Sequence, residues 1–180
     1  SNFATGANAV SVLAASGAAT DFGFRNTIDL QLQGTDVPVA AIAAGGAVAL
    51  DVAGRLTQAA NGRISGASLS GSATGGAILD TVANDVGVLG NFVSRGGEFR
   101  LLVGGGLVVG GALDAAGQAV TLRAAGGDIA GSGSVVAGAL TLDAAGTVSL
   151  EGAGNRVAVL RGARANGDFA LRNGGDLLLD

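Results

Sequence analysis

The chain has 180 residues and a formal net charge of −4, and it contains 34 Gly but no Cys, His, Met, Trp, Tyr or Lys. Charged residues make up only 13 % and hydrophobic residues 48 %, which excludes a disordered segment, and the scattered Arg residues argue against nucleic-acid binding. The missing residue types exclude Ser–His and Cys–His nucleophile pairs, the usual zinc ligands and a phosphate-loop lysine.

In chain order, the first feature is a motif that recurs three times. Residues Asn8–Leu13 (Asn-Ala-Val-Ser-Val-Leu) return as Asn84–Leu89 and as Asn155–Leu160. We therefore treat residues 1–180 as one repetitive segment with long repeats at 8–83, 84–154 and, in part, 155–180. Each motif is followed nine or ten residues later by a phenylalanine: Phe22, Phe99 and Phe169.

The first and third copies match over a longer stretch. Asp21–Leu32 aligns without gaps on Asp168–Leu179, with seven of twelve residues identical. We expect the three phenylalanines to fill the interior, and we expect Phe92, which breaks the pattern, to lie on the surface. The recurring Asn8, Asn84 and Asn155 are interpreted as turn residues or as buried asparagines at corners, where an amide can satisfy backbone groups. They are too far apart in sequence to stack directly on one another.

Between the first two motifs, Asn61-Gly62 is a possible hairpin turn. A hairpin there would favour an antiparallel Greek-key arrangement, which stays open as the alternative fold. Helices are disfavoured, because each interior Gly costs a helix about 1 kcal/mol relative to Ala.

The second half of the chain contains a shorter repeat of apolar–x–apolar triplets, the period-2 pattern of a strand with one buried face. Gly-rich turns separate them, as at Gly104–Gly106, Ala125–Asp128 and Gly174–Asp176. This pattern predicts an all-β solenoid with parallel strands of three to six residues and about 20 residues per coil. The triplets are Val120–Leu122, Leu140–Leu142, Val148–Leu150, Phe169–Leu171 and Leu177–Leu179.

Three carboxylates at strand ends are the candidates for a carbohydrate-active site: Asp128, Asp143 and Glu151. A structural role is the preferred interpretation. Asp128 suits a turn in which it bonds its own backbone, and Arg123 and Asp143 follow equivalent triplets, so they are expected to pair across adjacent coils.

No other stretch points to a ligand. Gly126–Ile129 and Gly174–Leu177 share fragments of a calcium-binding repeat but lack its spacing, and Gly104–Gly106 lacks that of a dinucleotide loop. We therefore assign no catalytic, cofactor-binding or metal-binding residue.

The termini and the apolar runs carry no targeting signal. Ser1–Val10 lacks the features of a signal peptide, and Val37–Leu50 and Leu101–Leu113 are too short for a membrane-spanning helix. Since no capping coil is evident at either end, we expect the chain to be a fragment of a longer protein.

The Asn-x-Val-x-Val-Leu motif with its downstream Phe, and the Val-Thr-Leu and Leu-Thr-Leu triplets among Ala-Gly-Gly-Asp turns, resemble filamentous haemagglutinin-like repeats. Such repeats occur in two-partner secretion exoproteins and autotransporter passengers of Gram-negative bacteria. The resemblance covers nearly the whole chain and is clearest over 84–180. The family's secretion domain carries Asn-Pro motifs that are absent here, where the only proline is Pro38.

The resemblance implies a right-handed parallel β-helix in the shaft of a secreted or surface-attached adhesin, active in adhesion, aggregation or biofilm matrix. Implied partners are host or neighbouring-cell surfaces or their glycans, and other solenoids through self-association. The alternatives are a self-assembling extracellular filament subunit and a carbohydrate-active β-helix protein.

Overall fold

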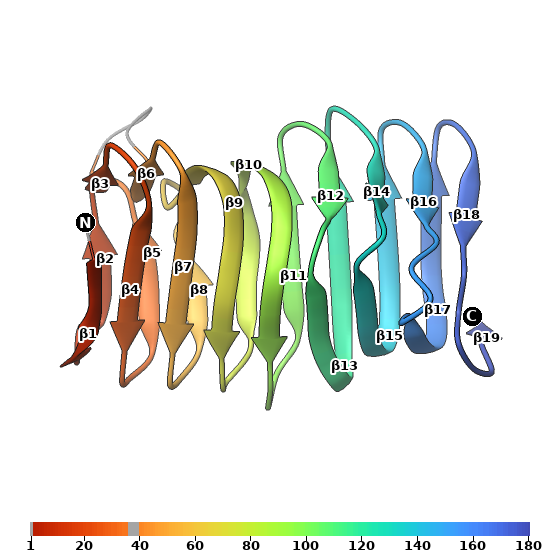
Figure 1. Cartoon of the computed structure of the whole chain (residues 1–180), viewed down its shortest axis with the longest axis horizontal. Helices are drawn as coiled ribbons and strands as arrows, with labels where there is room; N and C mark the ends of the chain where they lie inside the picture. The colour runs from red at the N-terminus through yellow and green to blue at the C-terminus, as the bar shows by residue number, and fades with distance from the viewer. Residues whose placement is uncertain (1, 36–39) are drawn as a thin grey trace.

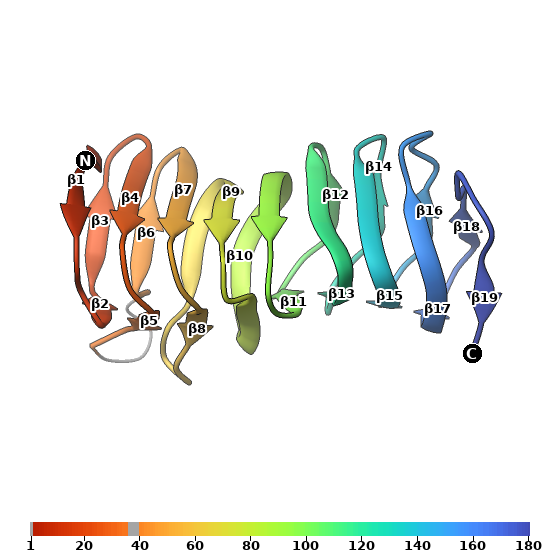
Figure 2. The same cartoon turned by 90° about the horizontal axis from the view of Figure 1, so that it is seen from below.

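The computed structural model describes residues 2–35 and 40–180, which form parallel β-strands and no helix. The strands wind into a β-solenoid of about eight turns with about 21 residues per turn. The turns follow one another along a single axis from the N-terminus to the C-terminus (Figure 1), and the view from below shows the same stack (Figure 2). The predicted fold class and coil length are therefore confirmed, whereas the right-handed sense of winding stays a prediction. Pro38 lies outside the described residues.

The strands of the first half are β1 (Asn2–Asn8), β2 (Val12–Ala14), β3 (Ser16–Ala18), β4 (Phe22–Asn26), β5 (Leu30–Gln33), β6 (Ile42–Ala44), β7 (Ala47–Val52), β8 (Leu56–Gln58), β9 (Ile64–Ala73) and β10 (Ala77–Ser94). Those of the second half are β11 (Phe99–Val103), β12 (Leu107–Val109), β13 (Ala112–Ala124), β14 (Ile129–Gly131), β15 (Ser134–Ala144), β16 (Val148–Leu150), β17 (Arg156–Ala165), β18 (Phe169–Leu171) and β19 (Leu178–Leu179).

Every pairing among the described strands is parallel, so the antiparallel alternative is wrong. Asn61-Gly62 does form a turn, in which the Gly62 N–H donates to the Ala59 carbonyl at 2.9 Å. The turn connects β8 to β9, and these strands pair with β5 and β6 of the preceding turn rather than with each other.

The length of a turn varies along the solenoid. In the second half Val120 pairs with Leu140, whereas in the first half Phe22 pairs with Val48, which is a distinctly longer step along the chain. The extra residues lie between β5, which ends at Gln33, and β6, which begins at Ile42. An insertion at a corner therefore leaves the strand register of the neighbouring faces intact.

The core is a set of inward-facing columns that run along the axis. In one column each side chain lies over its counterpart one turn later, and every member is buried, as expected for stacked short strands. The column consists of Leu30, Leu56, Ala77, Phe99, Val120, Leu140 and Leu160.

The predicted triplets correspond to observed strands, and Val148–Leu150 and Phe169–Leu171 match β16 and β18 residue for residue. The expected length of three to six residues is wrong for several strands, since β10 has 18 residues and β13 has 13. These long strands continue around a corner through a register shift, in β13 between Ala115 and Ala119.

The phenylalanines only partly follow the prediction. Phe22 and Phe99 are buried as expected. Phe92 is also fully buried, with its ring centroid 5.0 Å from that of Phe99, so its predicted surface position is wrong. A register shift between Leu89 and Phe92 moves Phe92 to the inner face, opposite Gly71. Gly71 has φ +139°, and a Cβ there would overlap the Leu50 carbonyl.

Phe169 is the other correction. It lies over Val148 in an inward column, but 41 % of its surface is exposed. The register pairing of β18 among the described strands is with β16 of the preceding turn, so no later turn covers this ring.

Candidate functional site

The recurring asparagines lie at corners of the solenoid, and Asn84 connects three successive turns. Its Oδ1 accepts a hydrogen bond from the Ile64 N–H of the preceding turn at 2.9 Å. Its Nδ2 donates to the Leu79 carbonyl of its own turn at 2.9 Å and to the Leu102 carbonyl of the next at 3.1 Å. The side chain is 1 % exposed, so the amide satisfies backbone groups that water does not reach.

Asn155 makes the same three connections. Its Oδ1 accepts from the Val135 N–H at 2.8 Å, and its Nδ2 donates to the Leu150 and Arg172 carbonyls, both at 3.0 Å. The Asn155 side chain is fully buried. The interpretation as buried corner asparagines is therefore confirmed for Asn84 and Asn155, whose amides bond backbone groups of this chain, whereas Asn8 is only half-buried.

The first and third copies of the motif fall at the same corner. The spacing from Asn8 to Asn155 is a whole number of turns of about 21 residues. Asn8 accordingly donates from Nδ2 to the Arg25 carbonyl at 2.9 Å, as Asn155 does to Arg172. Asn84 is out of phase with both, because no whole number of turns separates it from either copy.

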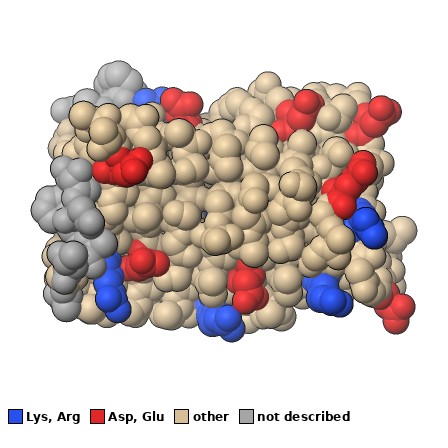
Figure 3. Space-filling model, viewed as in Figure 1, with Lys and Arg blue, Asp and Glu red and all other residues tan. Residues whose placement is uncertain are grey.

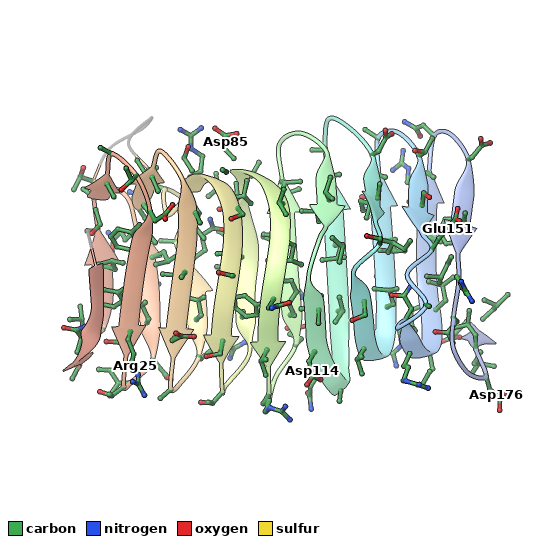
Figure 4. All side chains as sticks on the ribbon, in the orientation of Figure 1. Arg25, Asp85, Asp114, Glu151 and Asp176 are labelled. Carbon is green, nitrogen blue, oxygen red and sulfur yellow. The ribbon has the colours of Figure 1, made fainter. Side chains whose placement is uncertain are left out.

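The labelled neighbours in Figure 4 show that the copies use different edges. Asp85, next to Asn84, lies at the upper edge of the solenoid, whereas Arg25 and Asp176 lie at the lower edge. The same sequence motif thus forms the same hydrogen bonds at two different corners.

Asn26 and Asn173 are corner residues that the sequence reasoning did not single out. Each uses its amide to bond both backbone groups of one valine in the preceding turn, at 2.9 to 3.0 Å: Val10 for Asn26 and Val157 for Asn173. The signal was present, since both residues occupy the same position in the aligned segments 21–32 and 168–179.

Gln58 is a third residue that sequence reasoning missed. It stands in the inward column between Leu32 and the later leucines, only 5 % exposed. Its Nε2 donates to Asn84 Oδ1 at 2.7 Å and to the Gly62 carbonyl at 2.9 Å. Its Oε1 is the buried side-chain polar atom without a partner in the described part of the chain.

The Asp128 side chain forms a hydrogen bond with the backbone of the next turn rather than with that of its own turn. Its Oδ1 accepts from the Thr147 N–H at 2.6 Å, so the carboxylate bonds the backbone of the next turn, and the expected bond to its own backbone is wrong. A Cβ at Gly146, the residue before Thr147, would overlap this carboxylate oxygen. The same arrangement recurs at three other places. In each, an Asp or Asn side chain accepts a hydrogen bond from a backbone N–H one turn later, and the residue that donates it follows a glycine. The pairs are Asp21–Ala47, Asp29–Arg55 and Asn91–Ala112.

The three candidate carboxylates lie on or beside three different strands. Asp128 precedes β14, Asp143 lies on β15, and Glu151 follows β16, where its Oε1 is 3.3 Å from Ser149 Oγ. No hydrogen bond or ion pair found among the described residues joins any two of them.

Asp143 pairs with Arg123 as predicted. The two residues are in register on β13 and β15, and Arg123 Nε lies 3.1 Å from Asp143 Oδ2. Arg164 follows in register on β17. A groove of about 250 Å³ runs over these three side chains and Asn166. Both members of the pair are substantially exposed, and an exposed pair of this kind adds little stability.

Within residues 2–35 and 40–180 no three His, Cys, Asp or Glu side chains gather as metal ligands. No described helix could cross a membrane. No family model matches this chain, and neither do any curated proteins or solved structures.

Proposed function

We propose that this chain is a length of structural shaft from a secreted or cell-surface adhesin or fibre of a Gram-negative bacterium. Its work in this proposal is mechanical: it holds a binding region away from the cell and carries no active site. The observation that supports it best is the corner asparagine, because each side chain ties three successive turns together through buried hydrogen bonds.

The distribution of polar groups supports the same proposal. The buried polar side chains Asn26, Asn84 and Asn155 bond the backbone of neighbouring turns. Polar chemistry in this chain therefore serves stacking. A protein stabilised by contacts between neighbouring turns can be lengthened by adding turns without a change of cross-section.

The test is to change the number of turns in the organism that carries this gene. Ten extra turns copied from residues 112–133 should lengthen the projecting fibre by about 48 Å, at about 4.8 Å per turn, as measured by electron cryo-tomography. Antibodies against the chain should label intact cells, and attachment should persist. Labelling only after permeabilisation would contradict the proposal.

The carbohydrate-active alternative has a separate readout. The purified chain should leave a panel of acidic and neutral glycans intact, with Asp143→Ala and Glu151→Ala variants indistinguishable from the parent. Turnover of one glycan that either substitution abolishes would replace the shaft proposal with an enzyme.

A further inference from the structure

One face of the solenoid is uncharged along most of its length. On β7, β9, β10, β12, β14, β16 and β18, seven outward-facing residues lie in register on seven successive turns. We call this column the uncharged face: Ala47, Ser68, Val88, Val108, Ala130, Ser149 and Ala170. Figure 3 shows this side of the molecule, with an uncharged centre and charged residues gathered towards its margins.

The largest side chains of the uncharged face are exposed at its middle. Val88 and Val108 are neighbours in register, with 36 % and 45 % of their surfaces exposed. Every other member is a half-buried Ala or Ser. The backbone N–H and C=O groups of these strands bond along the axis to adjacent turns, so another β-face could cover the column without leaving backbone groups unsatisfied.

We propose that the uncharged face binds the same face of a second copy of this chain, with the two solenoids antiparallel about a twofold axis between Val88 and Val108. Val88 of each copy then contacts Val108 of the other, which is the reciprocal pattern of an isologous interface. Ser68 meets Ala130, and Ala47 meets Ser149. The interface does not require the adhesive role proposed above.

The charges beside the face favour this arrangement. A parallel column at the lower margin reads Asp51, Ser72, Val93, Asp114, Val136 and Arg156 on the first six of these turns. The same twofold axis places Asp51 of each copy opposite Arg156 of the other, so the dimer contains two such charge pairs.

Both residues are available for this contact. Asp51 and Arg156 are exposed, and neither forms an ion pair with another described residue. Asp114 already pairs with Arg95 of its own chain at 3.1 Å. Glu151, on the turn of Ser149, faces Ala49 of the second copy and so meets no like charge in register.

The area of the face suits a weak dimer. The axis pairs six turns of this face, and six strands at about 4.8 Å and five residues at about 3.3 Å give about 475 Å² per copy, or about 950 Å² in total. A specific interface needs about 1,000 Å², and smaller ones belong to weak, transient complexes, so the contact should be weak. Opposite charges at both ends of the column would set the antiparallel register.

Sedimentation velocity over a concentration series tests the interface. The chain should form a dimer, and Val88→Asp or Val108→Asp should weaken it at least tenfold. Ile28→Asp is the matched control, since Ile28 is 43 % exposed but lies between β4 and β5, away from the face. It should leave association unchanged. A parent chain that stays monomeric throughout, or an Ile28→Asp variant as disruptive as Val108→Asp, would overturn the proposal.

Charge reversal and cross-linking test the register. Asp51→Arg and Arg156→Asp should each weaken the dimer, and the double variant should recover it, because both charge pairs are restored. The chain has no Cys, so an Ala47→Cys chain mixed with a Ser149→Cys chain should cross-link through a short bis-maleimide. Neither variant should cross-link alone, because the antiparallel dimer separates like positions by five turns, or about 24 Å. Cross-linking within either single variant, or no recovery in the double charge variant, would contradict the antiparallel arrangement.

Discussion

Asn84 and Asn155 make the same hydrogen bonds at different corners of one solenoid. Both accept an N–H from the preceding turn, and both donate to a carbonyl of their own turn and to a carbonyl of the next. The spacing from Asn84 to Asn155 is not a whole number of turns of about 21 residues. The motif therefore encodes a local connection between turns and not a fixed position on the solenoid.

The two corners differ in one respect. Asn84 Oδ1 also accepts from Gln58 Nε2, whereas Asn155 has no such side-chain partner in the described chain. The Asn84 corner thus contains one more buried polar side chain, Gln58, whose Oε1 has no hydrogen-bond partner in the described chain. The difference predicts that the two corners respond unequally to the same substitution.

The largest expected effect is the loss of a corner amide. Asn84→Ala should cost about 3–5 kcal/mol and Asn155→Ala about 2–4 kcal/mol, because each buried group left without a partner costs about 1–3 kcal/mol. Urea unfolding followed by circular dichroism gives both values. Asn166→Ala, at an exposed residue of the groove, is the control and should change stability little. Equal losses at both corners would remove the distinction between them.

Asn26 and Asn173, which occupy the same position in the aligned segments 21–32 and 168–179, should respond alike to substitution. Asn26→Ala and Asn173→Ala each remove bonds to both backbone groups of a valine one turn earlier, so each should cost about 1–3 kcal/mol. Hydrogen exchange should rise at the Val10 N–H in one variant and at the Val157 N–H in the other. Faster exchange at only one of the two would show that the aligned segments are not equivalent.

Gln58 should be coupled to Asn84. Gln58→Leu restores an apolar side chain to a column of leucines and removes the unpartnered Oε1, so its cost alone should be within about 1 kcal/mol. In the Asn84→Ala background it should recover about 1 kcal/mol, since contacting residues are not additive. A double-mutant cycle measures this, with Asn155→Ala as the uncoupled background; coupling there would contradict the account.

The smallest expected effect is at the surface. Arg123→Ala removes an exposed ion pair that also joins two turns, and it should cost less than about 1 kcal/mol. The loss should shrink further at high salt concentration, at which ions screen exposed charges. A loss as large as that of Asn155→Ala would mean that surface pairs and corner amides contribute equally.

Much of the fold could be predicted because periodic patterns report repeated contacts. Val148–Leu150 alternates and becomes a buried strand, and the equivalence of Arg123 and Asp143 is visible from the triplets alone. Phe92 could not be placed, because the register shift that turns it inward depends on the neighbouring turns. The hydrogen-bond partners of Asn84 could not be predicted either, because backbone groups of other turns leave no pattern in the sequence.

A disulfide across neighbouring turns would test the central claim, the parallel in-register stack of turns, most directly. Thr121 and Thr141 face each other in register, so the Thr121→Cys/Thr141→Cys variant should close an intramolecular disulfide without loss of β-structure. The pair Thr121→Cys/Asp143→Cys is out of register and too far apart to bridge without strain. Closure of the first pair alone is the predicted result, and closure of the second pair in preference to the first would contradict the register of the stack.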